Sequence, residues 1–139
     1  MTGALVLFGT LAVAAVIGFA LRAHNGRVRT VNRTASANLP ADVRSVLDPD
    51  ASVTLVQLST TFCAPCRQAR ALLTDLAART DGLHHAELDL TERPDLAREL
   101  SVLRTPTTLA IGRSGAELLR IGGVPRRAEL LAALRPHLV

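Results

Sequence analysis

Cys63 and Cys66 are the only two cysteines of this 139-residue chain, and two residues separate them. A strand-like run, Val53 to Leu58, ends shortly before them, and a helix-like run from Arg67 to Arg79 follows. At the start of a helix, the partial positive charge of the backbone favours a thiolate at Cys63. That thiolate could attack a partner's disulfide, and Cys66 could then resolve the mixed disulfide. The spacing therefore predicts thiol–disulfide exchange.

A zinc site and a structural disulfide are the alternatives to redox chemistry at the cysteine pair. The pair could be half of a zinc site, but such a site usually needs a second pair of ligands, and the chain has no other cysteine. His84 and His85 could contribute, although neighbours on a strand point to opposite faces. The pair could also be a purely structural disulfide, but so short a loop gives little stabilisation. We favour the redox interpretation.

The net charge of +4 is unevenly distributed along the chain. All twelve acidic residues lie at Asp42 or later, and only four of the sixteen arginines precede that position, so residues 42–139 are formally neutral. Aromatic residues make up 2% of the chain. A nucleic-acid-binding function is therefore excluded, because the folded part has no basic excess and few rings for stacking.

The first segment, from Gly3 to Leu21, has no charged residue, and Thr10 is its one polar side chain. As a helix it would extend about 30 Å, enough to cross the hydrocarbon core of a bilayer. A secretory signal peptide is the competing interpretation. Signals begin with basic residues and end at a small-residue cleavage site, whereas only Met1 and Thr2 precede the apolar run and residues 20–23 match a cleavage site poorly. We predict a retained transmembrane anchor over residues 1–22, inserted through residues 3–21.

The charges that flank the apolar segment predict its orientation. Four arginines follow the segment and none precedes it, which by the positive-inside rule places the rest of the chain in the cytoplasm. An extracytoplasmic domain is the alternative. The polar stretch 23–38 is typical of a linker. The predicted organisation is thus an anchor (1–22), a linker (23–38) and a folded domain (39–139). The flanking arginines are Arg22, Arg27, Arg29 and Arg33.

The folded part alternates between helical and extended patterns. A short helix is expected up to about Leu47, followed by strands at 52–58 and 84–90 with the cysteine helix between them. Pro94 opens another helix, and a strand entered through Pro106 turns at Ser114-Gly115 into a return strand, 116–121, before a last helix over 126–137. This order predicts an α/β fold in which helices flank a mixed sheet.

The residues from about 40 to 139 resemble the thioredoxin family. The resemblance rests on Cys63-Ala64-Pro65-Cys66 at a helix start, on Thr105-Pro106 before a strand, on the hairpin and on Gly123 before the final helix. It implies a thioredoxin-like fold. The family's first strand is not obvious in the sequence, and either residues 28–33 supply it or it is absent.

The resemblance also implies roles for individual residues. Thr105-Pro106 would form a cis peptide beside the cysteines and present backbone to an extended substrate. Phe62, which stands where the family usually has Trp, would shape the docking surface together with Ala64, Pro65 and Gly123. No cofactor is expected beyond the redox-active Cys63–Cys66 dithiol. Ala64-Pro65 is close to the Gly-Pro of reducing members and lacks a thiolate-stabilising histidine, so we expect a reductase.

One departure from the family pattern concerns proton transfer. The family has a buried acid six residues before the first cysteine, where this chain has Gln57, whereas Glu87 lies on the neighbouring strand. We expect Glu87 to accept the proton of Cys66 during resolution. The alternative is that Glu87 faces an edge and that Gln57 is a hydrogen-bonded polar group of the core. The four histidines have no evident partners and are expected at the surface.

The expected function is that of a membrane-tethered protein-disulfide reductase acting on disulfide-containing client proteins. Its electrons would come from a soluble reductase if the domain is cytosolic, or from a transmembrane thiol carrier if it is outside. The alternatives are a redox sensor or regulatory subunit without turnover, and a thiol factor dedicated to the maturation of metal or haem proteins.

Overall fold

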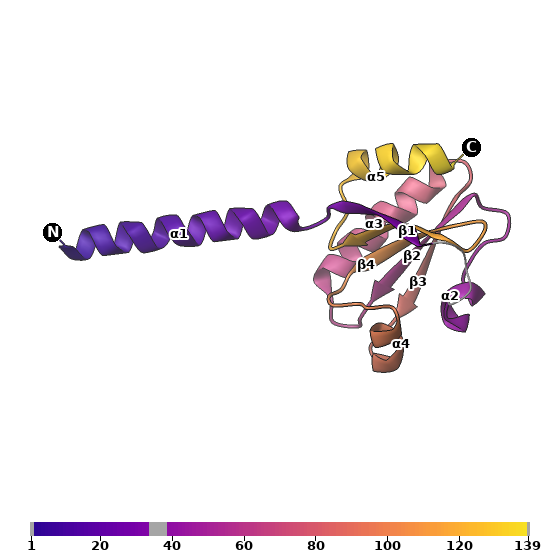
Figure 1. Cartoon of the computed structure of the whole chain (residues 1–139), viewed down its shortest axis with the longest axis horizontal. Coiled ribbons are helices and arrows are strands. Elements are labelled where there is room, and N and C mark those ends of the chain that lie inside the picture. Colours follow the sequence, from indigo (N-terminus) through magenta and orange to yellow (C-terminus); the bar gives the residue numbers. More distant parts are fainter. Residues whose placement is uncertain (1, 34–38, 139) are drawn as a thin grey trace.

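A computed structural model of the chain describes residues 2–33 and 39–138. Its centre is one five-stranded sheet in the order β1-β5-β4-β2-β3, in which β2 and β3 are parallel and the other pairs are antiparallel. The prediction of a mixed sheet flanked by helices is confirmed (Figure 1). The strands are β1 (Val28–Arg33), β2 (Val53–Ser59), β3 (Leu83–Asp89), β4 (Thr107–Gly112) and β5 (Glu117–Gly122).

Helices pack on both faces of the sheet, which explains why β2 is buried along its whole length. Val53 and Leu55 face one core, which contains leucines of α3 and α5. Val56 and Leu58 face a second core, which is closed by α2 and α4. An uninterrupted apolar strand is stable only where both of its faces are covered. The helices are α2 (Ala41–Ser45), α3 (Ala64–Ala78), α4 (Pro94–Glu99) and α5 (Arg127–Leu134), followed by a short 3-10 turn, Arg135–His137.

The prediction of a linker over residues 23–38 is wrong for residues 28–33, because these residues form β1. This strand pairs with β5, with Val28 opposite Ile121 and Thr30 opposite Leu119. Its β-branched residues favour an extended backbone, and Val28 packs against the core that contains α3 and α5. The apolar edge of β5 thereby gains a partner, and the family's first strand is present. Residues 34–38 of the predicted linker lie outside the described part of the chain.

The strand directions place several chain ends at one end of the sheet. In the antiparallel register Leu58 lies opposite Thr107, so β2 ends where β4 begins. The same reasoning brings the end of β5 and the start of β1 there, since Val28 pairs with Ile121. We call this end, which comprises Ser59, Asp89, Thr107, Gly122 and Val28, the C-terminal end of β2.

The apolar helix α1 (Thr2–His24) extends away from that same end (Figure 1). Within the described residues it is the one helix long and apolar enough to span a membrane, with a mean hydropathy of 2.5 over Gly3–His24 and no part of it buried in the protein. Its large apolar side chains, including Phe8 and Phe19, are exposed. By length and composition a signal sequence satisfies the same criteria.

Candidate functional site

The cysteine pair lies where β2 turns into α3. Cys63 is the N-cap residue of α3 and is joined to Cys66 in a disulfide with a Cα–Cα distance of 5.2 Å. The Cys66 backbone N–H donates to the Cys63 sulfur, with 3.2 Å between the two atoms. Pro65 stands in the first turn, where a missing N–H costs nothing. Cys63 is 8% exposed and Cys66 1%, so the first cysteine is the more accessible.

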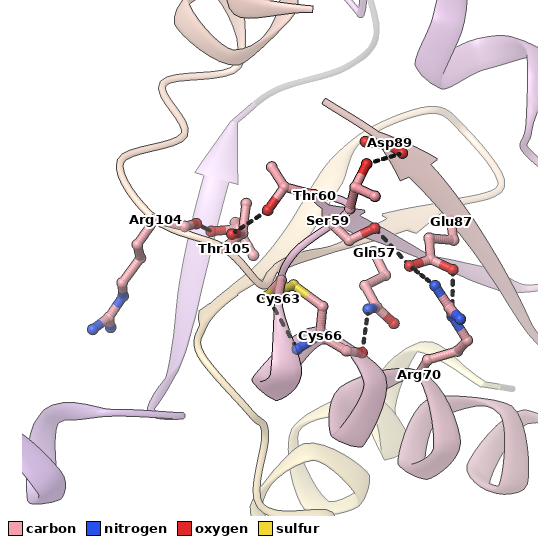
Figure 2. Close-up of a disulfide and its surroundings, with 12 residues drawn as sticks. Gln57, Ser59, Thr60, Cys63, Cys66, Arg70, Glu87, Asp89, Arg104 and Thr105 are labelled. Carbon is pink, nitrogen blue, oxygen red and sulfur yellow. Dashed lines mark hydrogen bonds and ion pairs between the residues drawn. A yellow bond between two sulfur atoms is a disulfide. The ribbon is translucent and has the colours of Figure 1, made fainter. Parts of the chain in front are cut away.

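Gln57 is completely buried beneath the disulfide and makes two hydrogen bonds (Figure 2). Its Nε2 donates to the Cys66 carbonyl oxygen over 2.9 Å, and its Oε1 lies 3.2 Å from His85 Nε2. Because Oε1 can only accept, His85 donates from Nε2, and its Nδ1 then accepts from the Thr74 hydroxyl over 3.1 Å. Burial lowers the pKa of His85, which favours this neutral form.

Two of the histidines predicted to lie at the surface without partners do have partners, so that prediction is wrong for them. His85 is partly buried and connects β3 to Gln57. His84 Nδ1 lies 3.5 Å from an Asp48 carboxylate oxygen. The physical reason is that a pattern of residue types along one strand does not show which side chains the neighbouring strand and helix place opposite it.

Glu87 lies on β3 directly beside Gln57 in the parallel register. Its carboxylate accepts two hydrogen bonds from Arg70 of α3, at 2.6 and 2.8 Å, and one from the Ser59 hydroxyl at 2.6 Å. Partial burial acts to raise the pKa of Glu87, but these hydrogen bonds and the charge of Arg70 hold it below its ordinary value. The carboxylate is therefore ionised at neutral pH.

An open cleft of about 370 Å³ connects Glu87 to the disulfide. Both cysteines and Glu87 line it, so the three residues border one cleft. Arg70 and Ser59 belong to the same wall (Figure 2). The remaining lining residues are Thr60, Thr61, Arg67 and Asp89. Among the described residues, no group of three His, Cys, Asp or Glu side chains is arranged to hold a metal ion.

The loop before β4 lies on the other side of the disulfide. Its Thr105-Pro106 peptide is cis, as the resemblance implied. Thr105 Oγ1 lies 3.3 Å from Thr60 Oγ1, and the Gly123 N–H donates to the Pro106 carbonyl oxygen over 2.7 Å. Gly123 has a φ of +90°, a conformation that side-chain-bearing residues rarely adopt. The structure therefore brings Gly123 and Pro106, both predicted as docking residues, into direct contact.

Two apolar side chains project from this end of the domain into solvent. Phe62, directly before Cys63, is 99% exposed, and Leu103, two residues before Thr105, is 97% exposed. Ala64 and Pro65 are exposed as well. The predicted surface residues thus lie around the disulfide, whereas Leu103, Arg70, Ser59 and His85 were not anticipated. The sequence carried no distinguishing signal for these four, since even Leu103 directly follows another apolar residue, Val102.

Comparisons with known proteins bear on the same region. The family model described as Thioredoxin matches residues 31–136, which include most of the chain from β1 onward, both cysteines and the cis-proline loop. This chain belongs to the thioredoxin family. Thioredoxin of Mycobacterium tuberculosis is 32% identical over 103 residues, which cover 73% of this chain and 84% of that protein. With its Cys63–Cys66 disulfide, this thioredoxin-family protein is a thiol–disulfide oxidoreductase.

Two further relatives extend the comparison. The bifunctional thioredoxin reductase/thioredoxin of Mycobacterium leprae is 33% identical over 99 residues, which cover 70% of this chain and 20% of that protein. Among solved structures, Fasciola hepatica thioredoxin superposes with a TM-score of 0.58 at 23% identity, covering 70% of this chain and 92% of that one. At this identity the structural match shows the fold alone. The family membership suggests disulfide-containing substrates and a reductase as electron donor.

Proposed function

We propose that this protein is a membrane-anchored reductase of protein disulfides, with Cys63 as nucleophile and Cys66 as resolving thiol. The observation that carries the proposal is the position of Cys63. Its sulfur caps α3 and accepts a backbone N–H, while Cys66 is buried behind it. An N–H donor and the helix N-terminus stabilise a thiolate at the accessible sulfur.

The reaction would begin from the reduced dithiol. The Cys63 thiolate attacks one sulfur of a client disulfide, the client S–S bond breaks, and the leaving client thiolate takes up a proton. Cys66 then loses its proton and attacks the Cys63 sulfur. This forms the Cys63–Cys66 disulfide and releases the second client thiolate, so two electrons pass from the dithiol to the client.

Glu87 is the proposed acceptor of the Cys66 proton. It shares the cleft with Cys66, and a cleft of about 370 Å³ has room for water that could carry the proton between them. Arg70 weakens the carboxylate as a base by stabilising its ionised form. Gln57 would act as a positioning residue, since it holds the Cys66 backbone through an amide that carries no charge.

The docking surface would consist of the residues around the disulfide. An extended client segment would run along the backbone of Thr105 and Pro106, with the apolar side chain of Phe62 against it. Ala64, Pro65 and Gly123 leave the approach to Cys63 free of large side chains. The absence of a histidine between the cysteines supports the reducing direction, because an imidazolium there would stabilise the thiolate and raise the potential.

The proposed anchor is α1. An apolar helix of this length with no buried part is unfavourable in water and fits the thickness of a bilayer. The arginines that follow it support a cytoplasmic domain. A thioredoxin reductase would then be the electron donor. The name of the M. leprae relative, bifunctional thioredoxin reductase/thioredoxin, joins these two functions in one chain. An extracytoplasmic domain would need a transmembrane thiol carrier instead.

Insulin reduction with dithiothreitol tests the turnover, using the full chain in detergent and a Cys63→Ser control. We expect catalysed precipitation of insulin that the control lacks, whereas a regulatory subunit would oxidise and reduce without accelerating the reaction. Reporters active on only one side of the membrane, fused after Val139, test the topology. A signal from the extracytoplasmic reporter would contradict the cytoplasmic orientation, and release of the chain by alkaline carbonate would contradict the anchor.

A further inference from the structure

The end of the anchor helix is attached to the substrate-binding face. Asn25, the first residue after α1, accepts a hydrogen bond through its Oδ1 from Arg104 Nη1 over 2.5 Å. Arg104 directly precedes the cis Thr105-Pro106 peptide, and its Nη2 donates to the Gly122 carbonyl oxygen over 3.1 Å. The first residue after the anchor helix and the residue that begins the substrate loop are therefore joined, and Figure 2 shows Thr105 near the disulfide with the Arg104 side chain directed away from it.

Gly26 strengthens this attachment. Its N–H donates to the same Gly122 carbonyl oxygen over 2.9 Å, and the residue is buried. With a φ of +77°, it lies so close to Val124 that an added Cβ would overlap the Val124 carbonyl oxygen. A Cβ on Gly123 would in turn approach the Gly26 nitrogen to 3.4 Å. The turn between anchor and domain is thus packed against the glycine that holds Pro106.

The connection between α1 and the sheet is short. Only residues 25–27 separate His24 at the end of α1 from Val28 at the start of β1. Three residues reach about 10 Å when fully extended, and these are held in a turn. The strand register places the start of β1 at the C-terminal end of β2, where the disulfide lies. Figure 1 shows α1 leaving the domain from the side on which α3 begins.

We infer that the client disulfides of this protein lie on membrane-embedded partners, close to the bilayer surface. The inference rests on the proposed anchoring of α1. With the membrane at the end of α1, the short, docked connection holds the Cys63 face beside the lipid headgroups and keeps it from reaching far into the aqueous phase. The exposed Phe62 and Leu103 suit an apolar juxtamembrane segment that flanks such a disulfide.

Co-reconstitution with defined substrates tests this inference. Full-length protein is placed in vesicles with a transmembrane peptide that carries a fluorogenic disulfide four residues beyond its apolar span. A second peptide carries the same disulfide on a helical spacer of about 30 Å, and a third substrate is a soluble disulfide peptide. With the native connection, we expect reduction of the near disulfide to be faster than that of the distant one by about tenfold or more.

The decisive variant contains a flexible Gly/Ser segment of about 25 Å average reach between His24 and Asn25, which leaves Asn25, Gly26 and the domain intact. We expect it to reduce the two peptides at rates within about twofold of each other. The matched control has the same segment appended after Val139 and should keep the near preference. Vesicles that contain Cys63→Ser give the background.

The outcomes distinguish failure of this inference from failure of the proposed reductase function. Equal rates on near and distant disulfides with the native connection would overturn the inference, while reduction of the soluble peptide in the same vesicles would uphold the reductase. A near preference that survives the insertion would also overturn it, because the connection would then not be its cause. Failure to reduce any of the three substrates, or loss of the chain from the vesicles, would contradict the proposed function itself.

Discussion

Replacement of Gln57 by Leu tests the buried hydrogen-bond network beneath the disulfide. The side chain is completely buried and makes two hydrogen bonds, to the Cys66 carbonyl oxygen and to His85. Leucine fills a similar volume but makes neither bond. At about 1 kcal/mol for each lost bond, the free energy of unfolding should fall by about 2 kcal/mol. For a domain of this size, Tm should fall by about 10 °C.

The measurement is urea unfolding of the full chain in mild detergent. The chain has no Trp or Tyr, so far-UV circular dichroism is the suitable signal. A double-mutant cycle with His85→Leu isolates the bond between the two side chains, and we expect a coupling of roughly 1 kcal/mol. If Gln57→Leu unfolds at the wild-type urea concentration, or if the cycle shows no coupling, the network does not contribute to stability and our reasoning is wrong.

The site and its surroundings support three more predictions. Burial holds the pKa of His85 below its ordinary value of 6.5, so near that pH the unfolded chain binds a proton that the folded chain does not. The free energy of unfolding should therefore decrease as pH falls below about 6.5, and His85→Gln should flatten this decrease in urea titrations. Glu87→Gln should slow the attack by Cys66 on a mixed disulfide by about 10²-fold, with less pH dependence, in rapid-mixing experiments; unchanged rates across pH would exclude Glu87 as the proton acceptor. Gly26→Ala should lower Tm by several degrees because its Cβ overlaps the Val124 carbonyl oxygen, whereas Gly9→Ala in α1, which has open space around it, should not.

Much of the site could be predicted from local sequence. The strand–helix order and the spacing of Cys63 and Cys66 are local patterns that indicate specific elements, whereas the cis geometry of Thr105-Pro106 was expected only from the resemblance to the thioredoxin family. The strand β1 was harder to predict, because a short and mostly polar stretch that follows an apolar helix resembles a linker. It becomes a strand only because the edge of β5 offers it hydrogen bonds and Val28 reaches the core.

The contacts between distant residues could not be predicted in the same way. Arg70 and Glu87 are seventeen positions apart, and Asn25 and Arg104 are seventy-nine apart. Each pair depends on the relative placement of two elements, which one sequence does not contain as a pattern. In a chain with sixteen arginines, nothing distinguishes Arg70 or Arg104 from the other fourteen before the fold is known. The attachment of the anchor to the substrate loop was unforeseen for this reason.

The proposed role of Glu87 would let a carboxylate serve the buried Cys66 thiol from a position on the strand beside Gln57. The Gln57 amide donates to the Cys66 carbonyl oxygen, which an ionised carboxylate could not do, because both of its oxygens only accept. An acid there would have to remain protonated or lose this contact, and its burial would be costly. The charge is instead carried by Glu87, which is paired with Gln57 on the edge strand β3 and lines the open cleft. Arg70 and Ser59 stabilise its carboxylate there. Under the proposed mechanism, the Gln57 amide would hold the Cys66 backbone and the Glu87 carboxylate would receive its proton, two tasks that one buried acid could not perform in the same ionisation state.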